Sequence, residues 1–339
     1  MLTVSTNSET APRTRYLSAD DVEKLAGWEA IAAALRQAYA QPIAPEMAPP
    51  RSIARADGIW MRGLSAVSPS RRHVGAKLIT VATASRKASY LVVLFDANSA
   101  ELVALIDGNH LTALRTAATS AMAADLLTAT AEPRVAVIGA GLEATNHLAA
   151  VAHLRALGPV KVFSPTPQRR RDFAARAARE YGLDATAVDS ASEAVTDADL
   201  VICAARSRDE SPTLLGEWLT PGATVVSIGS TIPEQREVDA TALGRADVIV
   251  ADMVSEVLDE TGDCLAATAA GFDLADKTVS LADVAAGRAP GRTDPQQIVI
   301  YKSVGSALQD VVLAELLLDQ AVTAGVGINA PAPIQAVQK

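Results

Sequence analysis

The sequence predicts an α/β protein with a doubly wound parallel sheet and a second, α+β domain whose sheet is mostly antiparallel. Two observations predict this division. From Arg134 onward, short β-branched apolar runs alternate with helical segments, a pattern typical of βαβ units. Before that point, over residues 59–106, strand-like runs follow one another without intervening helices, which indicates antiparallel pairing.

The N-terminal half begins with helices and continues with strands. Ser18 and Asp21 have the spacing of a capping box, and helical periodicity continues over residues 28–40. Residues 45–50 are proline-rich and are expected to form a loop. Strands are predicted over residues 59–64, 77–82, 90–95 and 101–106. An alanine-rich helix over residues 111–129 then leads into the second domain.

A glycine-rich turn follows the first parallel strand, in the run RVAVIGAGLEA that starts at Arg134. Gly139 permits the turn, Gly141 lets the backbone approach a diphosphate, and Ala144 keeps helix and strand close. The helix N-terminus then faces the anion. This is the dinucleotide-binding fingerprint of a Rossmann fold, and the expected cofactor contacts around it are Gly139, Gly141, Leu142, Glu143 and Ala144.

The remaining elements complete two domains. Further parallel strands are predicted over residues 160–163, 200–204, 224–228, 248–251 and 298–301. A final helix is expected over residues 303–322, followed by a loose tail over residues 329–339. The 339-residue length fits about two domains. We expect a disordered tail over residues 1–15, a first domain of residues 16–118 and 315–339, and a dinucleotide-binding domain over residues 119–314.

Composition argues against several classes of protein. The net charge of −9 and the pI of about 5.0 disfavour nucleic acid or an anionic membrane as a partner. No apolar run reaches the ~20 residues that span a bilayer, and residues 1–15 lack the apolar segment of a signal peptide. Cys203 and Cys264 are the only cysteines, and no CxxC or HExxH spacing occurs. We therefore expect a cytoplasmic protein with no metal site.

The end of the second parallel strand bears on the choice of cofactor. NAD-selective folds carry Asp or Glu there to bind the ribose 2′-hydroxyl. This chain instead offers Ser164, Thr166 and the arginines that begin with Arg169, which suit a 2′-phosphate. The pattern favours NADP(H), with NAD(H) as the alternative. The arginines could also be only the solvated start of a helix.

Three cations precede the nucleotide unit, on or next to predicted apolar elements. They are Arg51, Lys77 and Arg115. Buried cations need anionic partners. A substrate carboxylate would satisfy them, because arginine offers a bidentate fork and lysine a point charge. The alternative is pairing with an internal acid such as Asp107.

The segment DGNHLTALRTAA, residues 107–118, closely resembles the signature of the ornithine cyclodeaminase/mu-crystallin family. Further matches run in order from about residue 45 to 315: Pro50-Arg51, Gly75-Ala76-Lys77, Gly139-Ala140-Gly141, Thr261-Gly262-Asp263 and Tyr301-Lys302-Ser303-Val304-Gly305. The resemblance implies a homodimer whose first domain binds substrate and dimerises, and a nicotinamide cofactor. It also implies a substrate carboxylate held by Arg51, Lys77 and Arg115, with Thr116 near the cofactor and Ser303 to Gly305 near the nicotinamide.

Two positions depart from the ornithine-cyclising members. Those members resemble one another in an Asp that acts as acid/base after the fourth strand, where this chain has Thr231. A threonine hydroxyl does not titrate near neutrality, so we expect a catalytic contact there but no acid/base role. The nearby Glu234 is interpreted as a solvated turn residue, and Glu237 resembles the family's structural acid at a helix start. Arg62 stands where cyclising enzymes carry a Glu, and is a candidate substrate contact.

Together these features predict an NAD(P)H-dependent oxidoreductase acting on CH–NH or CH–NH2 groups. The favoured reaction is reduction of a ketimine or cyclic imino acid to an amino acid, or its reverse. The alternatives are an ornithine- or lysine-type cyclodeaminase with bound NAD, an opine-like N-substituted amino-acid dehydrogenase, and a crystallin-like NADPH-binding protein without turnover.

Overall fold

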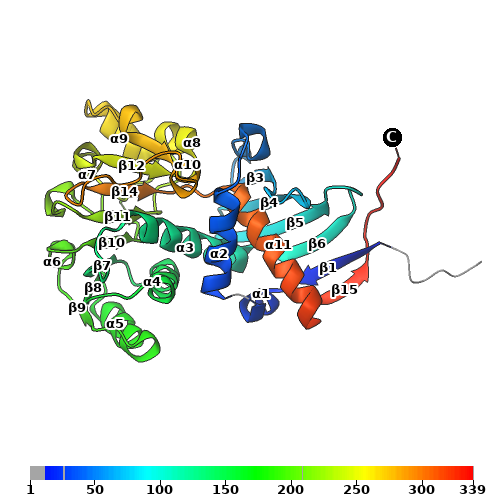
Figure 1. Ribbon diagram of the computed structural model, residues 1–339, viewed down its shortest axis with the longest axis horizontal. Coiled ribbons are helices and arrows are strands. Elements are labelled where there is room, and N and C mark those ends of the chain that lie inside the picture. Colours follow the sequence, from blue (N-terminus) through cyan, green and yellow to red (C-terminus); the bar gives the residue numbers. More distant parts are fainter. Residues whose placement is uncertain (1–11, 26, 208, 339) are drawn as a thin grey trace, which may run out of the picture. The chain divides into compact units, whose positions relative to one another are not determined.

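The computed structural model describes residues 12–25, 27–207 and 209–338 (Figure 1). The chain divides into two compact units. The first contains the described residues up to 38, residues 42–115 and residues 306–338, and the second contains residues 39–41 and 116–305. The predicted fold class is confirmed, because one unit holds a mostly antiparallel sheet and the other an all-parallel sheet.

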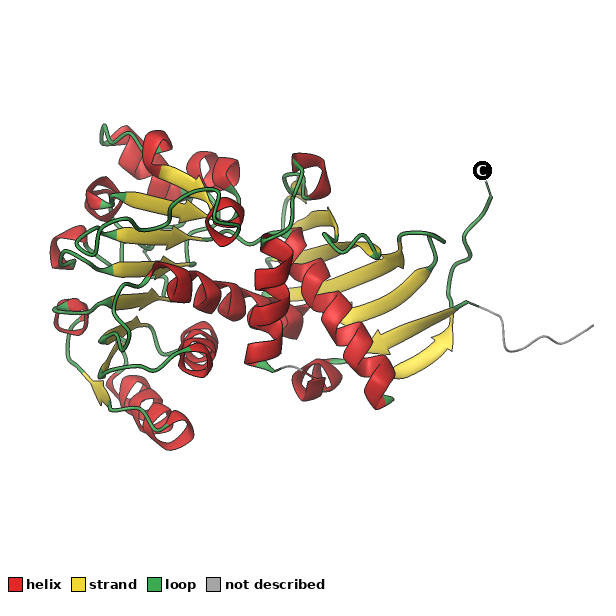
Figure 2. Ribbon diagram, in the orientation of Figure 1, coloured by secondary structure: helices red, strands yellow, loops and turns green. Residues whose placement is uncertain are grey.

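The first unit is built on a seven-stranded sheet in the order β15-β1-β6-β5-β4-β3-β2. Figure 2 draws the strands in yellow and the helices in red. Only the β1–β6 pair is parallel within this sheet. Its strands are β1 (Arg13–Leu17), β2 (Ser52–Ala56), β3 (Ile59–Val67), β4 (His73–Ala82), β5 (Lys87–Asp96), β6 (Leu102–Asp107) and β15 (Ile328–Pro331). Helix α11 (Ala307–Ala324) packs on β3, β4 and β5 and covers one face of the sheet.

The other helices of this region agree with the sequence pattern. Helix α1 (Ala19–Leu25) has the expected capping box, because the Asp21 backbone N–H donates to Ser18 Oγ and the Ser18 N–H donates to the Asp21 carboxylate. Helix α2 (Trp28–Tyr39) follows, and the expected loop contains the short 3₁₀ helix η1 (Pro45–Met47). Helix α3 (Gly108–Leu127) leads from the first unit into the second at residues 115 and 116.

The second unit is an eight-stranded parallel sheet in the order β13-β12-β14-β11-β10-β7-β8-β9. Its strands are β7 (Val135–Ile138), β8 (Val160–Phe163), β9 (Ala185–Ala187), β10 (Leu200–Cys203), β11 (Thr224–Ser227), β12 (Val248–Ala251), β13 (Thr278–Ser280) and β14 (Val299–Lys302). Its helices are α4 (Leu142–Leu154), α5 (Pro167–Tyr181), α6 (Ala191–Val195), α7 (Ala240–Arg245), α8 (Val254–Glu260), α9 (Gly262–Ala269), α10 (Leu281–Ala285), η2 (Gly216–Trp218) and η3 (Ala275–Lys277). Alanine, valine, leucine and isoleucine fill most of its core.

The ends of the chain differ from the sequence-based expectation. The prediction of a disordered tail over residues 1–15 is wrong for its last residues, because Arg13–Leu17 form β1. Residues 1–11 lie outside the described residues. The C-terminal stretch expected to be loose contributes to β15, which pairs with β1. The first unit resumes at residue 306 instead of the expected 315, because the whole of α11 belongs to it.

Within the described residues, no helix combines the length and apolar character that crossing a membrane would require. Over the same residues, no cluster of three or more His, Cys, Asp or Glu is arranged to hold a metal ion.

Candidate functional site

The glycine-rich turn of the second unit has room for an anion at one of its two glycines. Gly139 adopts φ +116°, and a Cβ there would lie 2.6 Å from the carbonyl oxygen of Ala204. Gly141 is the N-cap of α4 and provides no capping side chain, and a Cβ there would meet nothing within 4 Å. The buried Ala144 keeps α4 close to the sheet. The turn therefore fits a dinucleotide diphosphate approaching the first N–H groups of α4.

The polar residues after β8 have separate environments. Ser164 is buried, and Thr166 is the N-cap of α5. The side chain of Arg170 is engaged internally, since it donates to the Ser164 carbonyl oxygen and pairs with Asp189. Arg169 instead lines a hollow of about 440 Å³.

That hollow lies beside the glycine-rich turn and is basic. Ala140 of the turn lines it together with Arg169, Arg176 and Arg179, and Asp172 is the one acid in its lining. Arg169, one of the predicted arginines, therefore borders a basic hollow next to the turn. An arginine that served only as the solvated start of a helix would not need to line such a hollow.

In the first unit, two of the predicted cations converge on one acid. The side chains of Lys77 on β4 and Arg115 on α3 are 1% and 6% exposed, and Asp310 on α11 is fully buried. Lys77 Nζ lies 2.9 and 2.8 Å from the two Asp310 oxygens, and Arg115 Nε lies 2.9 Å from Oδ1. Arg115 also donates to Gln309 at 2.6 Å. An internal acid thus pairs with these cations, but it is Asp310 and not Asp107.

In the cluster formed by Lys77, Arg115 and Asp310, the carboxylate does not fully offset the burial of the lysine. Burial and then the charge of Arg115 lower the pKa of Lys77 to about 8, and the charge of Arg62 adds to this effect. Asp310 opposes the shift through its charge and its hydrogen bond without cancelling it. A further anion near Lys77 would stabilise the ammonium form.

The sheet register relates Arg51 and Arg62 to this cluster. Arg51 is half-buried and immediately precedes Ser52, the first residue of β2. Ser52 pairs with Gly63 of β3, and Leu64, which follows Gly63, pairs with Lys77 of β4. Because neighbouring strands lie ~4.8 Å apart, Arg51 lies about two strand spacings from Lys77. Arg62 on β3 lies with its guanidinium carbon 5.5 Å from the centre of the Trp60 ring.

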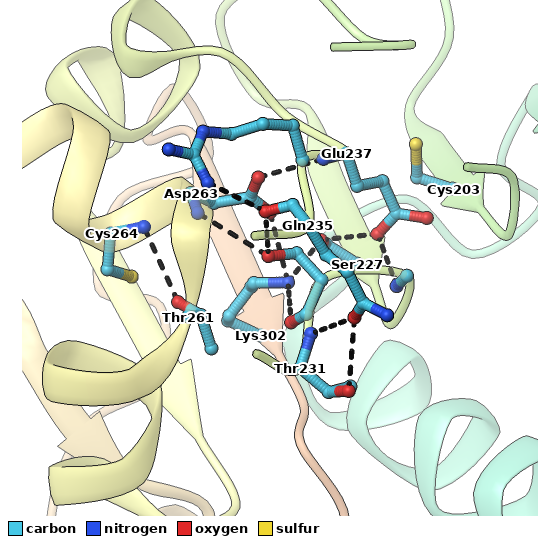
Figure 3. Close-up of polar contacts among 12 residues, drawn as sticks. Cys203, Ser227, Thr231, Gln235, Glu237, Thr261, Asp263, Cys264 and Lys302 are labelled. Carbon is cyan, nitrogen blue, oxygen red and sulfur yellow. Dashed lines mark hydrogen bonds and ion pairs between the residues drawn. The ribbon is translucent and has the colours of Figure 1, made fainter. Parts of the chain in front are cut away.

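A second buried polar cluster lies at the carboxyl ends of the central parallel strands (Figure 3). Lys302, at the end of β14, pairs with Asp263 at 3.1 Å and donates to Ser227 Oγ at 3.1 Å. Burial disfavours the charge of Lys302, but Asp263 and Glu237 raise its pKa overall. Lys302 also donates to the Ser230 carbonyl oxygen at 3.0 Å, so this cluster supports the loop after β11.

Glu237 joins the segments at the ends of β10 and β11 within the same cluster. Its carboxylate accepts hydrogen bonds from Ser227 Oγ at 2.6 Å, Gly229 N at 2.8 Å and Ala205 N at 3.3 Å. Its own N–H donates to Asp263. Burial raises the pKa of Glu237 to about 7, against the opposing effects of Lys302 and of its hydrogen-bond donors. Glu237 is therefore a structural acid, but it serves the strand ends and does not cap a helix.

Thr231 lies in the loop that this cluster supports. Its backbone N–H and its hydroxyl both donate to Gln235 Oε1, at 2.9 and 3.2 Å (Figure 3). Glu234 is exposed, as expected of a turn residue.

One carboxylate fixes the turn that the resemblance assigned to the nicotinamide. Asp252, after β12, accepts hydrogen bonds from Ser303 Oγ at 2.6 Å, Val304 N at 3.0 Å and Gly305 N at 2.8 Å. Thr116 is half-buried on α3, in its portion belonging to the second unit.

Sequence reasoning missed the role of Asp310 and the full set of contacts of Glu237. Asp310 directly precedes the apolar run that begins at Val311 on α11, and a charge in a mainly apolar helix was the available signal. The partners of Glu237 come from loops whose conformation the pattern does not specify.

Comparison with known proteins gives consistent results. Residues 17–325 match the ornithine cyclodeaminase/mu-crystallin family. The chain is 32% identical to mouse ketimine reductase mu-crystallin over 263 residues, 76% of this chain and 79% of the relative. It is 29% identical to a Bacillus cereus Δ1-pyrroline-2-carboxylate reductase over 275 residues, 80% and 81% of the two chains. The structure of the Thermococcus litoralis Δ1-pyrroline-2-carboxylate reductase with NADH and L-proline superposes with a TM-score of 0.84 at 26% identity, covering 94% of this chain and 100% of that one.

Proposed function

This chain belongs to the ornithine cyclodeaminase/mu-crystallin family, and from that premise we propose that it is an NAD(P)H-dependent imine reductase. Its substrate is a ketimine or cyclic imino acid that carries a carboxylate, such as pyrroline- or piperideine-2-carboxylate, and its product is the amino acid. Relatives named as ketimine reductase and as pyrroline-2-carboxylate reductase support this reaction class.

The observation that carries the proposal is the cation cluster of the first unit. Lys77 and Arg115 are almost fully buried and share one carboxylate, and the pKa of Lys77 stays lowered, at about 8, despite that carboxylate. Buried cations are stable only when they are paired. A substrate carboxylate would add a negative charge beside Lys77 and favour its ammonium form. We assign binding of that carboxylate to Arg51, Lys77 and Arg115, with Arg62 as a further contact.

The chemistry follows from these assignments. A nicotinamide dinucleotide would be held with its diphosphate at the turn of Gly139 and Gly141, and it would supply the hydride equivalent that reduction of a C=N bond needs. The ammonium group of Lys77 polarises or protonates the imine nitrogen. Thr231 is assigned no proton-transfer step, because its hydroxyl does not titrate near neutrality and already donates to Gln235. Placing both reactants in an attack geometry can lower the barrier by up to ~7–11 kcal/mol.

We further propose that NADPH is preferred over NADH. No carboxylate follows β8 directly to bind a ribose 2′-hydroxyl, and Ser164, Thr166 and Arg169 are available in its place. Arg169 also lines the basic hollow beside the glycine-rich turn.

We propose a homodimer formed through the first unit. Its sheet is covered by α11 on one face. Three apolar side chains, Met61, Val74 and Leu91, are between 37% and 45% exposed. An exposed apolar sheet face of this kind marks an interaction surface.

The test is NADPH and NADH oxidation by the purified protein with cyclic imines and with keto acids mixed with amines. We expect oxidation with imino acids that carry a carboxylate. The variant Lys77→Met should lose about 100-fold or more in turnover while NADPH binding, measured by fluorescence, stays unchanged.

Other outcomes would replace the proposal. Ammonia release from ornithine or lysine without net cofactor use would indicate a cyclodeaminase. An N-substituted amino acid formed from a keto acid and an amine would indicate an opine-like dehydrogenase. NADPH binding without oxidation by any of these compounds would indicate a crystallin-like binding protein.

A further inference from the structure

Asp310 occupies a position that links two elements of the substrate-binding unit. It lies on α11, is fully buried, and stands among the mainly apolar buried side chains of that helix. Its two cationic partners come from elsewhere in the unit, Lys77 from β4 and Arg115 from α3. One carboxylate therefore fixes the relative position of a strand cation and a helix cation.

The packing around Asp310 keeps α11 close to β4. A Cβ at Gly75, two residues before Lys77, would lie 2.6 Å from the Val93 carbonyl oxygen and 3.0 Å from Val311 Cγ2. The absence of a side chain at Gly75 lets α11 approach β4 at this point. Asp310, next to Val311, then reaches Lys77 Nζ at 2.8 Å.

The charged groups around Lys77 act on its ammonium form in opposite directions. Arg115 and Thr112 face it from α3, Arg62 acts on it from β3, and Asp310 faces it from α11. Both arginine charges disfavour the ammonium form, and Asp310 is the group that favours it. Asp310 thus does more than occupy space in the core.

We infer that Asp310 is a positioning residue for imine reduction: it holds Lys77 and Arg115 side by side and keeps the lysine protonated to receive the substrate carboxylate. This inference rests on the proposed function. It assigns a role in substrate binding and proton supply to a carboxylate that need not touch the substrate itself.

The test is the pH profile of kcat/KM with the best imine substrate, because its alkaline limb reports the ionisation of the enzyme without bound substrate. In the unaltered protein we expect that limb near pH 8, set by Lys77. In Asp310→Asn the lysine loses its carboxylate, its pKa falls, and the limb should move about one to three pH units lower. A purely structural role would reduce activity without moving the limb.

Glu315→Gln is the matched control. Glu315 is a second buried carboxylate of α11, but it accepts hydrogen bonds from Ser68, Ser70 and His73 and none from Lys77. Its loss should leave the alkaline limb in place. A limb that moves equally in both variants, or in neither, overturns the inference.

Asp310→Glu keeps the inference testable if Asp310→Asn does not fold. The charge remains but the carboxylate is displaced, so the limb should stay within about half a unit while kcat/KM falls about tenfold or more. Full activity of Asp310→Glu would overturn the positioning role. If the unaltered protein reduces no imine, the proposed function itself fails; imine reduction with an unmoved limb in Asp310→Asn defeats only the inference about Asp310.

Discussion

At the scale of single residues, buried charges carry most of the chemical information in this protein. The two units each hold a buried lysine, with opposite electrostatic outcomes. Lys77 has its pKa lowered to about 8 by burial and by Arg115, whereas Lys302 has its pKa raised because Asp263 and Glu237 outweigh its burial. A lysine that is poorly neutralised by its own protein is suited to bind an anion, and a well-neutralised one is suited to hold a structure together.

Glu237 leads to a prediction about stability. Its folded-state pKa, about 7, lies above its ordinary 4.5. A raised carboxyl pKa contributes stability that is complete below about pH 4.5 and is lost as the pH rises through about 7. The contribution is about 3 kcal/mol at most. The free energy of unfolding lost in Glu237→Gln, measured by denaturant titration, should therefore be larger at pH 5 than at pH 8.

The exposed Glu234 provides the control for that measurement, since Glu234→Gln should have a small effect that does not change over this pH range. A Glu237→Gln effect that is constant, or that grows with pH, would show that Glu237 is charged throughout in the folded protein.

Arg169 leads to a prediction about cofactor choice. If it binds the 2′-phosphate, Arg169→Ala should raise KM for NADPH roughly 10- to 100-fold, the loss of a hydrogen bond to a charged group, and leave KM for NADH nearly unchanged. Arg171→Ala is the matched control, because Arg171 is a neighbouring exposed arginine that donates to Gln168 and does not line the hollow. Equal or better use of NADH by the unaltered protein would defeat the proposed preference.

At the scale of elements, glycines decide where backbones and ligands can come close. Gly75 allows close contact of α11 with β4, and Gly139 allows close contact of the turn with Ala204. Gly141 differs from both, because the space around its Cβ position is open. Two of these glycines therefore serve packing, and the third leaves an approach to the N-terminus of α4.

This difference predicts separate effects for two substitutions in one turn. Gly141→Ala should leave the melting temperature nearly unchanged, because its φ of −94° suits alanine and no atom is nearby. Its methyl group should obstruct the diphosphate and weaken NADPH binding about tenfold or more, a loss of at least ~1.4 kcal/mol. Gly139→Ala should instead lower the melting temperature, because its φ of +116° strains alanine. Calorimetry and cofactor titration check both, and unaltered NADPH affinity in Gly141→Ala would contradict this assignment of the turn.

At the scale of the whole molecule, local patterns predicted what is local and missed what is distant. Strands β7, β8, β10, β11, β12 and β14, the glycine-rich turn and the capping box at Ser18 each depend on residues within one or two elements, and the structure contains them. The short strands β9 and β13 were not predicted. The β1–β15 pair joins residues 13 and 331, and Lys77 and Asp310 are separated by 233 positions. Strand β2 is exposed along its length and shows no apolar alternation. Such features depend on tertiary context that periodicity does not encode.

The last prediction concerns assembly of two chains. On β4, residues alternate between the face that packs on α11 and contains Lys77, and the opposite face, which contains Val74, Leu78 and Thr80. Met61 pairs with Thr80 and Leu91 pairs with Leu78, so both lie on that opposite face. Water contact with these apolar side chains is unfavourable, and a second copy of the sheet would remove it.

We therefore expect light scattering to give twice the 35.1 kDa chain mass for the unaltered protein and a single chain mass for the double variant Met61→Lys, Leu91→Lys. Val322→Lys is the matched control, because Val322 is a 59% exposed apolar residue on α11 and lies outside the sheet face. Two buried lysine charges would each need a partner that the apposed face does not offer, so the dimer should dissociate. A double variant that keeps the dimer mass would place the interface elsewhere, and an unaltered protein that is monomeric would remove the proposed assembly.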